Sequence, residues 1–141
     1  MPKPQISLQD KKTSLATAPA QTVLSSTDLQ RARAFYCDTL GLRLVNENPP
    51  EELYVEAGEG TQILIYRRSE APRAENTVCS FIVPDIDGTV NNLRSRGVRF
   101  EEYNLPGLKT VKGIASTGTW RAAWFKDPDG NIIAVSQRSP A

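Results

Sequence analysis

The segment Glu101-Glu102-Tyr103 places two carboxylates directly beside a phenol. A buried carboxylate next to a phenol can move protons, so these three residues are candidates for general acid–base catalysis. Charged residues at a strand end also protect a sheet edge, which is the alternative interpretation. The sequence leaves both interpretations open.

The chain contains no histidine. Histidine is the usual general base near neutral pH and the commonest metal ligand, and its absence removes Ser-His and Cys-His nucleophile pairs. The two cysteines, Cys37 and Cys79, are too few for a disulfide framework. We expect both to pack as small apolar side chains.

Aromatic and basic side chains are candidates for ligand recognition. Trp120 and Trp124 lie four positions apart in an expected strand, so they share a face of the sheet. If that face lines a cleft, the two rings can stack on a planar or cationic ligand; if it meets a helix, they pack in the core. Arg67 lies either at the mouth of a cleft, where it would select an anionic group, or at a solvated strand end.

The expected elements occur twice in the same order: strand, helix, and three further strands. In each half an Asp opens the helix and a Gly ends it, at Asp28 and Gly41 and again at Asp85 and Gly97. A capping-box pattern over residues 27–30 precedes the first helix. The expected strands cover residues 21–27, 42–47, 53–57 and 61–67 in the first half, and 77–83, 98–102, 120–125 and 132–136 in the second.

The remaining segments are expected to be connections. Residues 103–118 form a long loop that we expect to close over a cleft, and residues 127–131 form a tight turn. Residues 1–19 are polar and rich in proline, which predicts a flexible N-terminal extension. Residues 20–141 are expected to form a single domain, with modules at about 20–75 and 76–138.

Length and composition exclude several classes. The chain has 141 residues, with 17 basic and 16 acidic side chains and a net charge of +1. The sequence has no long run of one charge, which would be typical of a nucleic-acid-binding protein. No apolar run approaches the roughly 20 residues of a membrane span, and no secretory signal is evident. We therefore expect a cytoplasmic protein without nucleic-acid or membrane partners.

The motifs of both halves resemble those of the vicinal oxygen chelate superfamily, which includes glyoxalases, bleomycin-resistance proteins and extradiol dioxygenases. They are DLQRARAFY (28–36) with LGL (40–42), FIVPDI (81–86), LRSRGV (93–98) and WFKDPDGN (124–131). The resemblance implies an α+β fold in which paired βαβββ modules form a curled mixed sheet around a central cleft, with the helices outside. It also implies a small-molecule ligand and a homodimer.

Metalloenzymes of that superfamily hold a divalent ion with four side chains. The resemblance places these positions at Gln21, near Ile65, at Val78 and at Ala134. A register error of one would offer Thr22, Leu64 or Thr77 instead. First-row metals prefer imidazole, thiolate or carboxylate ligands, so we expect neither a metal nor another cofactor.

We therefore predict a metal-independent small-molecule-binding protein that sequesters an aromatic or antibiotic-like ligand. The alternative is a lyase, an isomerase or a dioxygenase-type enzyme of the same superfamily. The expected ligand-binding residues are mainly apolar, with a few hydroxyl groups. They are Gln21, Val23, Ser25, Ile63, Ile65, Arg67, Val78, Ser80, Trp120, Trp124, Ile132 and Ala134.

Overall fold

The computed structural model describes residue 7 and residues 12–138. The greater part of the expected extension, residues 1–6 and 8–11, therefore lies outside the described residues. The described part of the extension contains a single 3-10 turn, η1 (Leu15–Thr17), in which the Ser14 side chain accepts a hydrogen bond from the Ala16 N–H. None of the described helices is long and apolar enough to cross a membrane.

The first module is a four-stranded sheet with one helical segment. Its elements are β1 (Thr22–Ser26), α2 (Leu29–Arg33), the π-helix η2 (Ala34–Thr39), β2 (Arg43–Asn48), β3 (Glu52–Glu56), the 3-10 turn η3 (Gly58–Gly60) and β4 (Gln62–Arg67). The strand order is β1-β4-β3-β2. Strand β1 runs parallel to β4, and the other neighbours are antiparallel.

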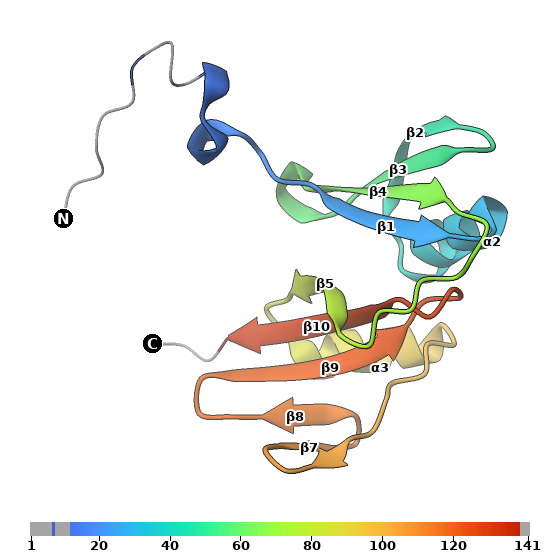
Figure 1. The fold of residues 1–141 in the computed structure, drawn as a ribbon. Helices are drawn as coiled ribbons and strands as arrows, with labels where there is room; N and C mark the ends of the chain where they lie inside the picture. Colours follow the sequence, from blue (N-terminus) through green and yellow to red (C-terminus); the bar gives the residue numbers. More distant parts are fainter. Residues whose placement is uncertain (1–6, 8–11, 139–141) are drawn as a thin grey trace.

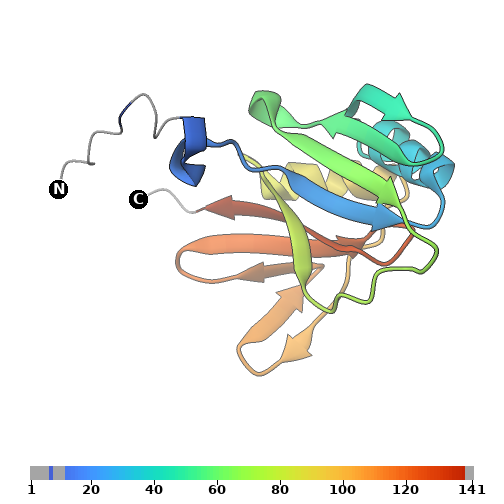
Figure 2. The same ribbon diagram turned by 45° about the horizontal axis from the view of Figure 1, so that its top comes forward.

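The second module repeats this plan and extends it. Its elements are β5 (Thr77–Ile82), α3 (Ile86–Ser95), β6 (Asn104–Leu105), β7 (Leu108–Val111), β8 (Ile114–Ser116), β9 (Trp120–Lys126) and β10 (Ile132–Arg138). The strand order is β5-β10-β9-β8-β7-β6, with β5 parallel to β10. Figure 1 shows the two sheets as separate halves of the molecule, and Figure 2 shows the same halves turned. The α+β fold with two related modules is as predicted.

The helix ends follow the sequence signals, with one difference. The side chain of Asp28 caps α2 by accepting from the Arg31 N–H, and Asp85 caps α3 in the same way. Thr27, which the capping-box pattern indicated as the cap, instead directs its hydroxyl to Asp129. Gly41 and Gly97 have φ values of +82° and +94°, the left-handed conformation that ends a helix.

Two predictions for the second module are wrong. Residues 98–102 do not form a strand; they make one isolated bridge, between Phe100 and Phe125. Residues 103–118 are not a lid loop, because they contain β6, β7 and β8. The two errors have one cause, because two segments share the edge of β9 that does not pair with β10. Strand β8 pairs with the N-terminal half of β9, and residues 100–101 contact its C-terminal half.

One face of each sheet packs against its helix and forms a continuous core. In the first sheet this face carries Leu24, Leu53, Val55, Ile63 and Ile65, and in the second Ala123, Phe125, Ile133 and Val135. Tyr36 and the α3 residues Ile86, Val90 and Leu93 complete this core. The opposite face of each sheet is called the open face below.

A turn of the second module holds the first module through a buried carboxylate. Asp129 accepts hydrogen bonds from Ser26 Oγ (2.6 Å) and from the N–H and hydroxyl of Thr27 (2.9 and 2.7 Å). The guanidinium of Arg31 adds an ion pair at 2.9 Å. Only 1% of the Asp129 side chain is exposed, so these donors offset the loss of its hydration.

The same turn makes a second set of contacts. The hydroxyl of Tyr36 donates to Asp127 at 2.6 Å, and the amide of Asn131 donates to Asp127 and to the Ser25 carbonyl. The turn therefore does more than connect β9 to β10. It fixes the position of one module relative to the other.

Candidate ligand-binding site

The two tryptophans lie on the open face of the second sheet. Trp124 is the direct cross-strand partner of Ala134, and its chain neighbours Ala123 and Phe125 are buried in the core. Successive side chains of a strand point to opposite faces, so Trp124 and Trp120 point away from α3. The structure thereby decides between the two orientations that the sequence left open.

These tryptophans line a pocket of about 400 Å³, called the aromatic pocket below. The volume lies within the range of ligand pockets in proteins. The floor is formed by small side chains and the rim by hydroxyl groups. Its lining residues are Thr77, Ser80, Thr119, Trp120, Ala122, Trp124, Ala134, Ser136 and Arg138.

Neighbouring aromatic side chains hold the tryptophans in place. The rings of Trp120 and Trp124 meet edge to face, with centroids 6.4 Å apart, and the ring of Tyr103 makes a second edge-to-face contact with Trp124 at 5.6 Å. The indole Nε1 of Trp124 donates to Thr77 Oγ1 at 3.1 Å. Edge-to-face contacts of this kind stabilise an aromatic pair, so the surface for a ligand is already formed.

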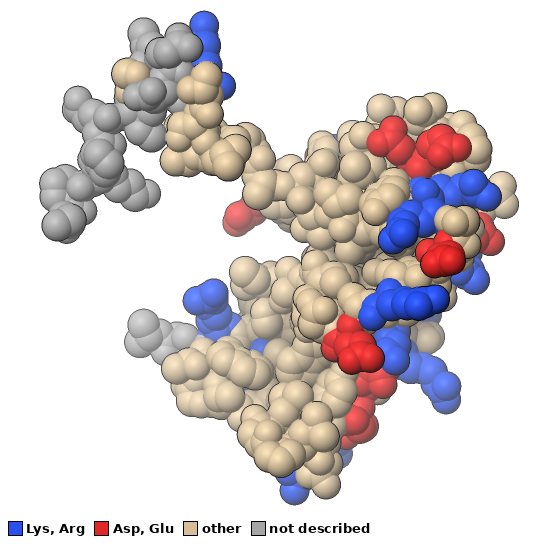
Figure 3. Space-filling view, in the orientation of Figure 1, with Lys and Arg blue, Asp and Glu red and all other residues tan. Residues whose placement is uncertain are grey.

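The lining of the aromatic pocket contains one charged side chain and no carboxylate. That side chain is Arg138, which lies directly across the ladder from Trp120 on the same face. The hydroxyls of Ser80 and Ser136 share one hydrogen bond at 3.3 Å. In Figure 3 the charged side chains gather along one edge of the molecule, whereas the walls of the notch between the two halves are mainly uncharged.

The structure brings four of the predicted ligand-binding residues together in the aromatic pocket: Ser80, Trp120, Trp124 and Ala134. Val23 and Ser25 lie on the open face of the first sheet, in register with Leu64 and Tyr66, and Gln21 immediately precedes β1. The expected cleft was shared by both modules. The aromatic pocket is lined by the second module alone.

Four other predicted residues lie elsewhere. Ile63 and Ile65 are 3% and 1% exposed and pack in the core, because β4 turns its odd-numbered side chains towards the helix. Val78 also packs against the core. Ile132 shares the open face with Ala134, two positions along β10, but it is not a lining residue of the aromatic pocket. Ile63, Ile65 and Val78 thus pack in or against the core, and none of the four side chains lines the aromatic pocket.

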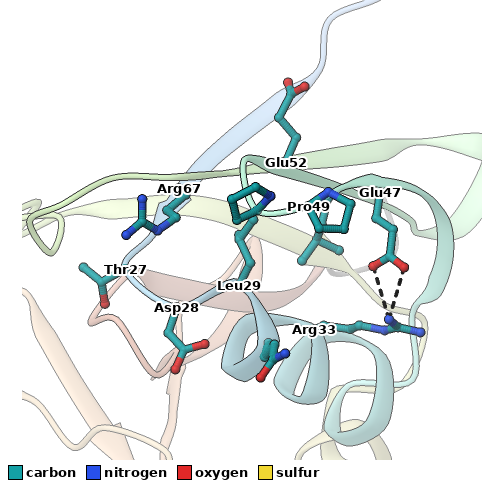
Figure 4. A pocket seen from close by; sticks show the side chains of 11 residues that line it. Thr27, Asp28, Leu29, Arg33, Glu47, Pro49, Glu52 and Arg67 are labelled. Atoms are coloured by element: carbon teal, nitrogen blue, oxygen red, sulfur yellow. Dashed lines mark hydrogen bonds and ion pairs between the residues drawn. The ribbon is translucent and has the colours of Figure 1, made fainter.

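Arg67 lies at a different pocket, on the helix side of the first sheet (Figure 4). This pocket has a volume of about 460 Å³, and an ion pair between Arg33 and Glu47 at 3.2 Å forms one wall. Its lining includes Asp28 and Glu52 but no aromatic side chain. Charges of both signs and the lack of a stacking surface make it a poorer site for an aromatic ligand than the aromatic pocket.

The three candidate acid–base residues are divided between different surroundings. Glu102 accepts a hydrogen bond from the Thr110 hydroxyl of β7 at 3.1 Å, whereas Tyr103 contacts Trp124. Burial, and then the charge of Glu101, raise the pKa of Tyr103. Tyr103 is therefore a proton or hydrogen-bond donor at neutral pH, and not a base.

The side chains at the four expected metal positions do not fit a divalent transition metal. Gln21 offers one amide, Val78 and Ala134 offer no donor, and β4 places aliphatic Leu64, not a carboxylate, on the open face. Among residues 7 and 12–138, no group of three or more His, Cys, Asp or Glu side chains is arranged to hold an ion. Imidazole, thiolate or carboxylate ligands would be needed.

Sequence reasoning missed five residues of the aromatic pocket as ligand-binding residues: Thr77, Thr119, Ala122, Ser136 and Arg138. Strand periodicity could have indicated three of them. Ala122 lies between the two tryptophans, and Ser136 and Arg138 follow Ala134 at intervals of two, so all share one face. Thr77 and Thr119 lie at the ends of strands, where periodicity gives no signal.

A layered pair of βαβββ-type modules with open sheet faces defines the class of fold. The sequence matches the family model of the Glyoxalase/Bleomycin resistance protein/Dioxygenase superfamily over residues 18–135. The chain belongs to this superfamily, as the motifs indicated. A search of curated proteins by sequence finds no match.

Several solved structures are similar to the chain. A superfamily member from Sphaerobacter thermophilus DSM 20745 is 26% identical, with a TM-score of 0.64 over 87% of this chain and 99% of that one. TnmS3, an antibiotic binding protein from Streptomyces sp. CB03234, is 23% identical, with a TM-score of 0.59 over 86% and 97%. Lactoylglutathione lyase from Agrobacterium tumefaciens is 22% identical, with a TM-score of 0.63 over 86% and 93%.

Proposed function

We propose that the protein binds a planar aromatic small molecule in the aromatic pocket without a metal ion, and that it sequesters this molecule unchanged. The observation that carries the proposal is the pair of preorganised indole rings, Trp120 and Trp124, in an open pocket of about 400 Å³. Ala122 and Ala134 leave a flat floor beside them, on which a fused ring system can lie.

Sequestration needs affinity but no chemical step. A protein that binds a toxic compound tightly lowers its free concentration by mass action. The similar antibiotic binding protein TnmS3 is consistent with this kind of role, although the likeness supports only the fold. The poor fit of the side chains at Gln21, Leu64, Val78 and Ala134 to a metal ion supports a metal-independent protein.

The competing function is catalysis by a lyase, an isomerase or a dioxygenase-type enzyme. Tyr103 supports it, because this protonated phenol contacts Trp124 at the border of the aromatic pocket. A thermal-shift screen of planar aromatic compounds, followed by mass spectrometry of each hit after incubation, separates the two functions. We expect hits that are recovered unchanged, with the same shifts in the presence of EDTA. Conversion of a hit, or loss of binding in EDTA, would contradict the proposal.

We also propose a homodimer. The outer strands β1 and β5 carry exposed apolar side chains, Val23 at 51% and Ile82 at 72%. An outer strand has unpaired backbone groups along one edge, which readily pair with another chain. Light scattering should give a mass of twice 15.5 kDa. A monomer at micromolar concentration would contradict the proposal.

A further inference from the structure

We propose that the ligand of the aromatic pocket is an aromatic anion, whose ring stacks on one tryptophan and meets the other edge to face, and whose negative group binds Arg138. The inference rests on the proposed function, because it assigns the chemical class of the molecule that this pocket binds. It is drawn from the polar groups that line the pocket.

The charge of the pocket is unbalanced. Arg138 is its single charged lining residue, and its side chain makes no ion pair with any residue in the described part of the chain. A guanidinium has five N–H donors and no acceptor, so its natural complement is a carboxylate, sulfonate or phosphate group.

The neutral polar groups also favour an acceptor-rich ligand. Thr77 Oγ1 accepts the bond from the Trp124 indole, which leaves the hydroxyl hydrogen of Thr77 free to donate. Ser80 and Ser136 share one hydrogen bond, so the pair has one further hydroxyl hydrogen to donate. A negative group placed among these donors would receive several hydrogen bonds and meet no like charge.

The position of Arg138 relative to the rings sets the shape of the ligand. Arg138 and Trp120 are cross-strand partners, and such partners have Cβ atoms about 4.5–5.5 Å apart. Trp124 lies four residues further along β9, on the same face of the sheet and opposite Ala134. The geometry therefore fits a flat molecule with its anionic group at one end, beside the C-terminal end of β10.

The experiment compares two probes that differ in charge but hardly in shape, 2-naphthoate and 2-naphthamide. Their affinities for the wild-type protein, the Arg138→Gln variant and an Arg68→Gln control are measured by isothermal titration calorimetry at pH 7. Arg68 is an exposed arginine of the first module, outside the pocket. The control thus removes the same net charge at a distance from the site.

We expect the wild type and the Arg68→Gln control to bind the carboxylate at least tenfold more tightly than the amide, since hydrogen bonds to charged groups are the stronger ones. Arg138→Gln should abolish this preference for the carboxylate. Added salt should weaken binding of the carboxylate alone.

Two negative results have different meanings. Equal affinity for both probes in the wild type, or an undiminished preference for the carboxylate in Arg138→Gln, would overturn the assignment of an aromatic anion and leave the proposed function standing. No binding of either probe would contradict the proposed function itself, and this inference with it.

Discussion

Ser26 Oγ lies 2.6 Å from Asp129 Oδ2, although 103 positions separate the two residues in the chain. This contact joins the end of β1 to the turn between β9 and β10. Because Asp129 is buried and accepts from Ser26, Thr27 and Arg31, its charge is compensated only when both modules are in place. The stability of the whole domain should therefore depend on this carboxylate.

Replacement of Asp129 by Asn should lower the free energy of unfolding by about 2 kcal/mol or more. The variant loses the ion pair with Arg31 and turns an N–H group towards donors that need an acceptor. Urea denaturation monitored by circular dichroism measures the change. Asp38→Asn, at an exposed aspartate, is the matched control and should change stability by less than about 0.5 kcal/mol. Equal effects at both positions would show that the contact is unimportant.

The same carboxylate should make stability depend on pH. Burial alone would raise the pKa of Asp129, but hydrogen bonds from Ser26 and Thr27 and the charge of Arg31 outweigh it, so the pKa lies below its ordinary value. A lowered pKa in the folded state stabilises the protein above the unfolded pKa of about 3.9, and this contribution is lost as the pH falls further. Between about pH 5 and pH 3, the wild type should lose stability more steeply than Asp129→Asn. Parallel pH profiles in urea would contradict the expectation.

Tyr36→Phe should lower the free energy of unfolding by about 1–3 kcal/mol, because it removes a hydrogen bond to a buried carboxylate. The hydroxyl of Tyr36 lies 2.6 Å from Asp127, and burial together with the charge of Asp127 raises the pKa of Tyr36 far above its ordinary value. Tyr54→Phe is the control, since the Tyr54 hydroxyl lies 3.3 Å from Glu52 at a more accessible position. Chemical denaturation of both variants should show a loss at Tyr36 alone.

Gly113→Ala tests the hairpin that replaces the expected lid. Gly113 has a φ of +84°, and an added Cβ would lie 2.8 Å from Arg94 Nη2 and 3.2 Å from Phe100 Cβ. Arg94 cannot move away freely, because it donates to the Lys112 carbonyl at 2.7 Å. We expect a loss of about 1–2 kcal/mol or more, seen as a lower melting temperature. Gly118→Ala, with open space around its Cβ, should melt within about a degree or two of the wild type.

Trp124→Ala should weaken binding of 2-naphthoate about tenfold or more, because stacking on one aromatic ring contributes roughly 1–3 kcal/mol. The control is Tyr66→Ala, which removes an aromatic side chain from the open face of the first sheet, outside the aromatic pocket. Calorimetry gives the affinities, and circular dichroism confirms that both variants are folded. Similar affinities for the two variants would indicate that the ligand binds elsewhere.

The sequence was a good guide to the repeated fold, because helix caps and helix-ending glycines act locally. Asp28, Gly41, Asp85 and Gly97 all occur where such signals place them. The β7–β8 hairpin was missed for a local reason too. Its turn places Lys112 at a φ of +52°, whereas two-residue hairpin turns of this type favour Asn, Asp or Gly at such a position.

The site was harder to predict, because alternation along a strand fixes which side chains share a face but not which face meets a helix. Trp120 and Trp124 were correctly grouped, yet their exposure to a pocket emerged only from the structure. For Ile63 and Ile65 the same ambiguity gave the wrong face. Ile63 and Ile65 point into the core, whereas their neighbour Leu64 in β4 points to the open face, so an error of one residue selects the wrong face.

The reciprocal contacts at Asp129 also constrain how such domains can be recombined. Neither half of the chain alone supplies both the donors Ser26 and Thr27 and the carboxylate that accepts from them. A chimera that joins the first half of one homologue to the second half of another would keep these hydrogen bonds only if its two halves supplied matching donors and acceptor at these positions. Substitutions at Ser26, Thr27 and Asp129 should therefore be compatible with one another, although the residues lie in two stretches of chain that are far apart in the sequence.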